Sequence, residues 1–173
     1  RLIVSNIAGT TRDAVDTPIE IDGQKYIFID TAGMRRKSKI KEEIERFSII
    51  RAVAAVERCD VAILVIDANE GITDQDTKIA GIAHERGKAA IIAVNKWDSI
   101  EKDEKTMNKY LKDIGMELKY MDYAPCCFIS ALTGQRCMHL YPLIQQVYAE
   151  CCRRVTTGML NDVLNDAMTR VQP

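Results

Sequence analysis

The sequence Asn-Lys-Trp-Asp at 95–98 places an amide, an ammonium and a carboxylate directly after an apolar run at 89–94. A carboxylate at Asp98 can accept hydrogen bonds from both the ring N–H and the exocyclic amino group of guanine. Adenine presents an acceptor where guanine has that ring donor, so the same carboxylate would lose the pair of bonds. Asn95 can bond the loop and the purine edge, and the stem of Lys96 can cover one face of the base. This chemistry favours guanine, although short motifs also arise by chance in solvated loops.

Two further segments carry groups suited to a phosphate and a hard cation. In Asp-Thr-Ala-Gly at 30–33, Asp30 can hold Mg²⁺ through a water, because hard cations prefer oxygen ligands. The backbone N–H of Gly33 has no side chain in its way and can reach a terminal phosphate. Upstream, Gly-Thr-Thr-Arg-Asp at 9–13 offers a threonine hydroxyl that can complete the metal shell. The structural alternatives are a helix N-cap with a turn for the first segment and an ordinary polar turn for the second.

A fourth segment, Ser-Ala-Leu at 130–132, follows the apolar run at 126–129 and places the backbone N–H of a small residue beside the oxygen of the base. The segment at 95–98 likewise lies just beyond a predicted strand. Ligands of α/β folds bind at the carboxyl ends of parallel strands. The position of this motif therefore supports the nucleotide interpretation.

The elements that must position these segments alternate between strands and helices, which predicts an α/β fold with a mostly parallel sheet flanked by helices. Two strands joined at Asp22-Gly23, a favourable dipeptide for a tight turn, are expected at 15–21 and 24–29. Nearly continuous apolar runs, typical of strands buried on both faces, occupy 61–66, 89–94 and 126–129. Helices, one of them capped by Gly87, are expected at 42–58, 73–86, 103–114, 138–152 and 155–171.

Composition excludes several classes of protein. Hydrophobic residues make up 47% and charged residues 28%, which argues against disorder. Apolar runs are too short to span a bilayer, and no secretory signal is visible, so a cytoplasmic protein without membrane contact is expected. A net charge of −1 gives no global attraction to nucleic acid. The six cysteines and two histidines lack metal-ligand spacing, and the cysteines are expected to be reduced thiols.

The four segments, in this order and spacing, resemble the translation-factor-like branch of P-loop GTPases. Longer stretches resemble the Der (EngA) family of bacterial ribosome-assembly GTPases, namely those at 3–13, 30–37, 123–125 and 130–134. The resemblance covers nearly the whole chain and fits the second of that family's two GTPase domains best. It implies a P-loop NTPase-type fold that binds GTP or GDP with Mg²⁺ and hydrolyses GTP, and it suggests K⁺ as a further ion.

The resemblance also implies a role for each site residue. Thr11 and Asp30 would be magnesium ligands, and together with Gly33 they would form the catalytic set. The guanine pocket would consist of Asn95, Lys96, Asp98, Ser130, Ala131 and Leu132. Met34 stands where Ras-like enzymes place the glutamine that orients water, so no general base can be named.

Partners follow from the same resemblance: the precursor of the large ribosomal subunit and its rRNA, bound through the parent protein. A second GTPase domain and a KH-like domain would lie in cis. Residues 1–153 would form the GTPase domain, and 154–173 would begin the KH-like domain or form an appended helix. The basic run at 35–41 would contact rRNA or be a solvated loop.

One departure from the family is the absence of Gly-x-x-x-x-Gly-Lys-Ser/Thr, the loop whose backbone amides cradle phosphates. We therefore expect the sheet to be incomplete at its N-terminal side and the chain to be inactive by itself. Two alternatives stay open at this point. One is a tRNA-modification-type GTPase, which shares the run at 8–13, and the other is a non-catalytic scaffold domain.

Overall fold

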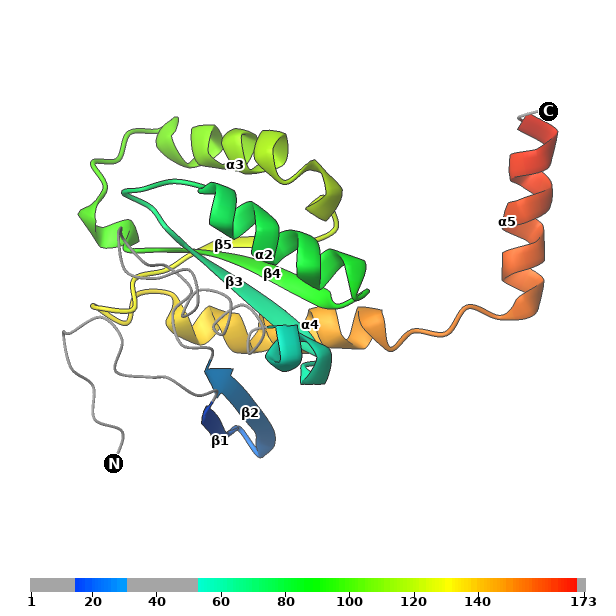
Figure 1. Ribbon diagram of the computed structural model, residues 1–173, viewed down its shortest axis with the longest axis horizontal. Coiled ribbons are helices and arrows are strands. Elements are labelled where there is room, and N and C mark those ends of the chain that lie inside the picture. The colour runs from blue at the N-terminus through cyan, green and yellow to red at the C-terminus, as the bar shows by residue number, and fades with distance from the viewer. Residues whose placement is uncertain (1–14, 31–52, 171–173) are drawn as a thin grey trace.

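The computed structural model describes residues 15–30 and 53–170 (Figure 1). Its strands are β1 (Val15–Ile21), β2 (Gln24–Asp30), β3 (Val61–Asp67), β4 (Ala89–Asn95) and β5 (Cys126–Phe128). Its helices are α2 (Asp74–Glu85), α3 (Thr106–Glu117), α4 (Leu140–Cys151) and α5 (Thr157–Arg170). Short 3₁₀ turns are η1 (Trp97–Ser99), η2 (Lys119–Met121) and η3 (Cys137–His139). Residues 53–58 are helical, and the rest of the helix expected at 42–58 lies outside the described residues.

Strands β1 and β2 form the predicted antiparallel hairpin, with Ile21 paired to Gln24. The two turn residues, Asp22 and Gly23, both have positive φ, at 51° and 77°. This combination matches a type I′ turn, whose twist suits a two-residue hairpin and which favours Asp-Gly. The hairpin contacts α4 through Tyr26, whose ring lies 5.3 Å from that of Tyr141.

Strands β3, β4 and β5 form a parallel sheet in that order, so β4 is its central strand. Residues 89–94 of β4 are all buried, which confirms the strand predicted from a continuous apolar run. Figure 1 places α2 and α3 on one side of this sheet and α4 on the other. The main core lies on the α2 and α3 side and includes Leu64, Ile92, Ile114 and Phe128. Within the described residues, no helix is long and apolar enough to cross a membrane.

Helix α2 has clear signals at both ends. Thr73 is its N-cap and exchanges hydrogen bonds with Asp76 in a capping box. At the other end Gly87 has a φ of 63°, and its N–H donates to His84 O at 2.9 Å. The predicted role of Gly87 as a C-terminal cap is confirmed.

Helix α3 begins at Thr106 rather than at the predicted residue 103 and extends to Glu117. Asp103 and Thr106 bond each other, because Asp103 N donates to Thr106 Oγ1 at 2.9 Å and Thr106 Oγ1 donates to Asp103 Oδ1 at 2.6 Å. These side-chain bonds hold a turn that precedes the helix, since Asp and Thr compete with backbone partners.

The helix predicted at 155–171 is confirmed as α5, which lies apart from the other helices (Figure 1). All of its side chains are exposed, including the apolar Leu160, Val163 and Leu164. The six cysteines are free thiols, of which Cys126 packs against the main core while Cys151 and Cys152 are exposed.

Candidate functional site

The carboxyl ends of β4 and β5 bring two of the predicted segments together. Ala131 N donates a hydrogen bond of 2.9 Å to Asn95 Oδ1. Trp97 N donates to Ile129 O at 3.1 Å, so a second hydrogen bond joins the two segments. The segments at 95–98 and 130–132 are therefore neighbours at the edge of the parallel sheet where α/β folds bind ligands.

The loop after β4 is anchored by Trp97, which is only 6% exposed. Its ring centroid lies 4.4 Å from that of Phe128 and 5.1 Å from that of Tyr110, the latter in an edge-on arrangement. Trp97 is therefore a packing residue of the core. Because Trp97 points into the core, Lys96 and Asp98 on either side of it are left exposed.

Lys96 has a left-handed backbone, with φ 61° and ψ 30°, and its ammonium pairs with Asp67 at the end of β3. The distance from Lys96 Nζ to Asp67 Oδ2 is 2.6 Å, and the Asp67 side chain is 10% exposed. Burial by itself would raise the pKa of Asp67, but hydrogen bonds from Lys96 and Asn69 outweigh it and hold that pKa below its ordinary value. Asp67 is thus held as a carboxylate next to the predicted guanine motif.

The segment at 130–132 starts from a fully buried serine. Ser130 N donates to Gln135 O at 3.0 Å, and Ser130 Oγ accepts from Thr133 N at 3.2 Å. Leu132 is 88% exposed. The Ala131 N–H donates to Asn95, so its expected approach to the oxygen of a base stays a prediction.

Most of the predicted catalytic and magnesium-binding residues lie outside the residues that the structure describes. Thr11 and Gly33 are not among the described residues, and Asp30 is the last residue of β2, opposite Val15 in the register. Within the described ranges, no group of three or more histidine, cysteine or acidic side chains could hold a metal. The predicted Mg²⁺ site rests on Thr11 and Asp30 and stays a prediction.

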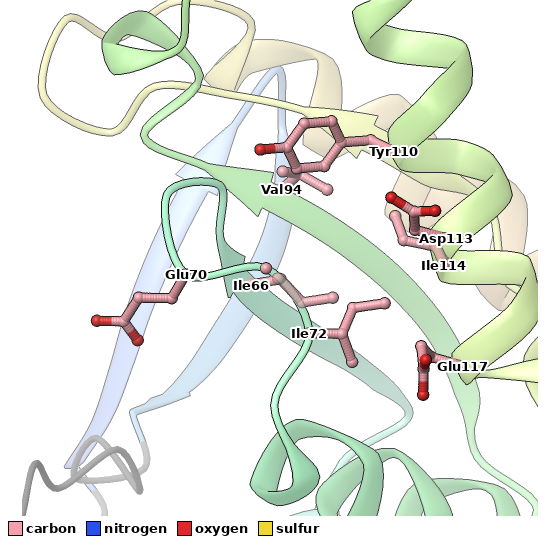
Figure 2. A pocket seen from close by; sticks show the side chains of 9 residues that line it. Ile66, Glu70, Ile72, Val94, Tyr110, Asp113, Ile114 and Glu117 are labelled. Carbon is pink, nitrogen blue, oxygen red and sulfur yellow. The ribbon is translucent and has the colours of Figure 1, made fainter.

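A cavity of about 240 Å³ lies between the loop after β3 and helix α3 (Figure 2). Ile66, Ile72 and Val94 form part of its apolar lining, and Asp113 and Glu117 add carboxylates from α3. None of the residues predicted to bind the nucleotide lines it. Carboxylates repel phosphate groups, so this cavity is not a suitable nucleotide site.

Residues 1–96 match the profile of a family described as 50S ribosome-binding GTPase. This match covers more than half of the chain. The chain belongs to this family. The α/β fold of the P-loop GTPase type, expected from the sequence, agrees with that membership.

Curated relatives of this family member are named GTPase Der. That of Lachnospira eligens is 60% identical over 173 residues, and that of Agathobacter rectalis is also 60% identical over 173 residues. In both comparisons the match takes in 100% of this chain and 39% of the relative. The chain therefore spans well under half the length of these relatives. Their names confirm the predicted resemblance and do not favour the tRNA-modification or scaffold alternatives.

Solved structures of Era are similar in fold. Era in complex with MgGDPNP and part of 16S ribosomal RNA has a TM-score of 0.70 and 28% identity, over 84% of this chain and 47% of that chain. An Era variant from Aquifex aeolicus bound to GDP and AlF4⁻ has a TM-score of 0.71 and 28% identity, over 84% of this chain and 48% of that chain. The fold predicted from alternating strands and helices is confirmed.

Three residues next to the predicted guanine motif, Asp67, Asn69 and Ser99, were not predicted from the sequence. A signal was present for Asp67, because a carboxylate that closes a strand buried among apolar residues needs a partner. Asn69 and Ser99 are both exposed and follow the strands as ordinary loop residues, so their sequence positions carry no such signal.

Proposed function

We propose that this chain is the guanine-nucleotide-binding switch domain of a Der-type GTPase that hydrolyses GTP. The observation that carries the proposal is the hydrogen bond from Ala131 N to Asn95 Oδ1. This bond holds two loops with guanine-recognition chemistry side by side at the carboxyl edge of the parallel sheet.

In the proposed site, Asp98 accepts hydrogen bonds from the ring N–H and amino group of guanine. Its carboxylate is exposed, so a base can approach it. The exposed stem of Lys96 covers one face of the base while its ammonium stays beside Asp67. Ser130, Ala131 and Leu132 form the wall next to Asn95. Specificity against adenine comes from Asp98, because adenine offers no donor pair to a carboxylate.

Chemistry at the phosphates is proposed from the family. Thr11 and Asp30 would hold Mg²⁺, which would neutralise charge on the phosphate oxygens. The Gly33 N–H would contact the terminal phosphate, and K⁺, which the family resemblance suggests, would supply further positive charge. Binding of GTP orders the segments that carry Thr11 and Gly33, and hydrolysis releases them.

The parent protein, in this proposal, acts in the cytoplasm on the precursor of the large ribosomal subunit and its rRNA. The family description, which names the 50S ribosome, supports this role, and the 16S rRNA bound to Era supports only the more general point that a GTPase of similar fold contacts ribosomal RNA. Residues 1–153 form the GTPase domain, and 154–173 begin a KH-like domain. Exposure of every side chain of α5 supports that division, since an isolated amphipathic helix gains stability by packing.

The test is a titration of the full-length parent protein with fluorescent GDP, with GTP, ATP and Mg²⁺ varied separately. We expect saturable binding that GTP displaces and that a hundredfold excess of ATP does not, together with GTP hydrolysis. Equal displacement by ATP and GTP would overturn guanine recognition. Tight binding of GDP and GTP without hydrolysis would mean that the protein only binds the nucleotide, and the proposed GTPase activity would be overturned.

A further inference from the structure

A ring of polar contacts ties the end of β3 to the loop that carries Asp98. Asp67 Oδ2 lies 2.6 Å from Lys96 Nζ, and Asp67 Oδ1 accepts from Asn69 N at 2.9 Å and from Asn69 Nδ2 at 3.2 Å. Asn69 Nδ2 also donates to Ser99 Oγ at 2.8 Å, and Ser99 Oγ donates to Lys96 O at 2.7 Å. We call these four residues, Asp67, Asn69, Lys96 and Ser99, the Asp67 brace.

The brace contacts Lys96 at two points, the side-chain ammonium and the backbone carbonyl oxygen. This matters because Lys96 has a φ of 61°, in a region that residues with a Cβ rarely adopt. Such a backbone persists only where its surroundings over-determine it, and it is often found at functional sites. Asn95 directly precedes Lys96 and Asp98 follows it by two residues, so the backbone angles of Lys96 affect the relative orientation of these two side chains.

The difference in exposure between the two charged side chains indicates that Asp67 holds Lys96 in place. Asp67 is a carboxylate with little exposure, whereas the Lys96 side chain is 59% exposed. A long exposed lysine samples many rotamers unless a partner holds it. Asp67 is a fixed partner, because it ends a strand whose register pairs it with Asn95 and because Ala68 N donates to Asn95 O at 2.9 Å.

We propose that Asp67 is the positioning residue for guanine recognition, acting through Lys96 and through Asn69 and Ser99 on the angle at which Asp98 meets the base. The inference rests on the proposed function and adds to it a determinant of selectivity that lies on a neighbouring strand. Asp67 itself does not touch the nucleotide in this arrangement. Its effect is expected on selectivity between purines as well as on affinity.

The experiment compares GDP with IDP, which lacks the exocyclic amino group, on full-length protein. Asp67→Asn keeps the size of the side chain and removes the charge, and Ser99→Ala opens the ring at an exposed position. Asp113→Asn, a carboxylate on α3 away from the loop, is the matched control. Fluorescent GDP gives the Kd and the dissociation rate, competition gives the GDP-to-IDP ratio, and thermal unfolding is followed in parallel.

Asp67→Asn and Ser99→Ala should each weaken GDP binding, the former about tenfold, which is the scale of one charge-assisted hydrogen bond. Both should lower the preference for GDP over IDP, while Asp113→Asn leaves it unchanged. A lower Tm with an unchanged GDP-to-IDP ratio in both variants means a structural role only and overturns the inference. Failure of the unmodified protein to bind GDP would instead overturn the proposed function, so the two failures are distinguishable.

Discussion

Ala131 donates its backbone N–H to the side chain of Asn95, and the two residues are 36 positions apart in the chain. The bond exists because β4 and β5 are parallel neighbours, with Val94 opposite Phe128, so the loops that follow them leave the sheet together. It makes Asn95 a structural link between two loops as well as a candidate contact to the base.

Asn95→Ala should therefore reduce both stability and nucleotide binding. The Ala131 N–H loses its acceptor, and because this bond is exposed and water can replace the acceptor, the cost should be about 0.5–1.5 kcal/mol of unfolding free energy. GDP affinity should fall by at least tenfold. Thermal unfolding and fluorescent GDP titration on the full-length protein measure the two effects. Asn108→Ala, on the exposed side of α3, is the matched control, and equal results for both variants would contradict the prediction.

Asp98→Asn should change which purine binds. An amide presents a donor where the carboxylate had an acceptor, so it mismatches the amino group of guanine and matches the carbonyl that xanthine carries at that position. We expect GDP affinity to fall by about a hundredfold, as for the loss of two charge-assisted bonds, while XDP affinity rises.

Competition of GDP and XDP against a fluorescent nucleotide measures this exchange. Glu101→Gln removes an exposed carboxylate from the same loop region and should leave the GDP-to-XDP ratio unchanged. If Asp98→Asn bound neither GDP nor XDP, the substitution would have disrupted the loop rather than altered base recognition.

Much of the fold follows from local sequence signals. Asp22-Gly23 predicts the hairpin because few dipeptides accept two positive φ values, and the apolar run at 89–94 predicts a strand buried on both faces. The start of α3 was misplaced by three residues, since the bonds between Asp103 and Thr106 compete with the helix. Such competition is decided by side-chain geometry that composition does not reveal.

The candidate site is only partly predictable. The segments at 95–98 and 130–132 were expected to bind one base, and the structure brings them together. Asp67 was not expected, because its contact with Lys96 depends on the pairing of β3 with β4 and on a left-handed backbone at Lys96. Neither the strand pairing nor this backbone conformation can be predicted from the presence of a lysine in a short motif.

Trp97→Ala should destabilise the domain more than any loop substitution above. The ring fills space between Phe128 and Tyr110 and is 6% exposed, and truncation of a buried aromatic residue costs about 3–5 kcal/mol of unfolding free energy. Urea denaturation followed by circular dichroism measures the loss. Trp97→Phe should recover most of it, and Met107→Ala, at an exposed position on α3, should cost little. A loss below 1 kcal/mol for Trp97→Ala would contradict this packing argument.

Asp67 should make the fold sensitive to acid. Its pKa is lower in the folded protein than in the unfolded chain, where aspartate titrates near 3.9. The ionised carboxylate therefore adds stability above about pH 4, and this contribution is lost as the pH falls through the lower folded-state pKa. We expect unfolding free energies of the unmodified protein and Asp67→Asn to converge below about pH 4. A difference that stays constant from pH 7 to pH 3, as expected for a change in packing alone, would argue against this origin.

Thiol reactivity should separate the cysteines by their surroundings. Burial raises the pKa of Cys126 to about 12 and that of Cys127 to about 11, so both stay protonated at pH 8. Only the thiolate attacks alkylating reagents, and Cys151 and Cys152 are exposed on the last turn of α4 and just beyond it. Brief treatment with iodoacetamide at pH 8, followed by peptide mass spectrometry, should therefore label Cys151 and Cys152 well before Cys126 and Cys127. In urea all four should react at similar rates, since unfolding removes the burial that separates them. Early labelling of Cys126 in the native protein would show that β5 opens readily, and a site built on the ends of β4 and β5 would then lose its rigid support.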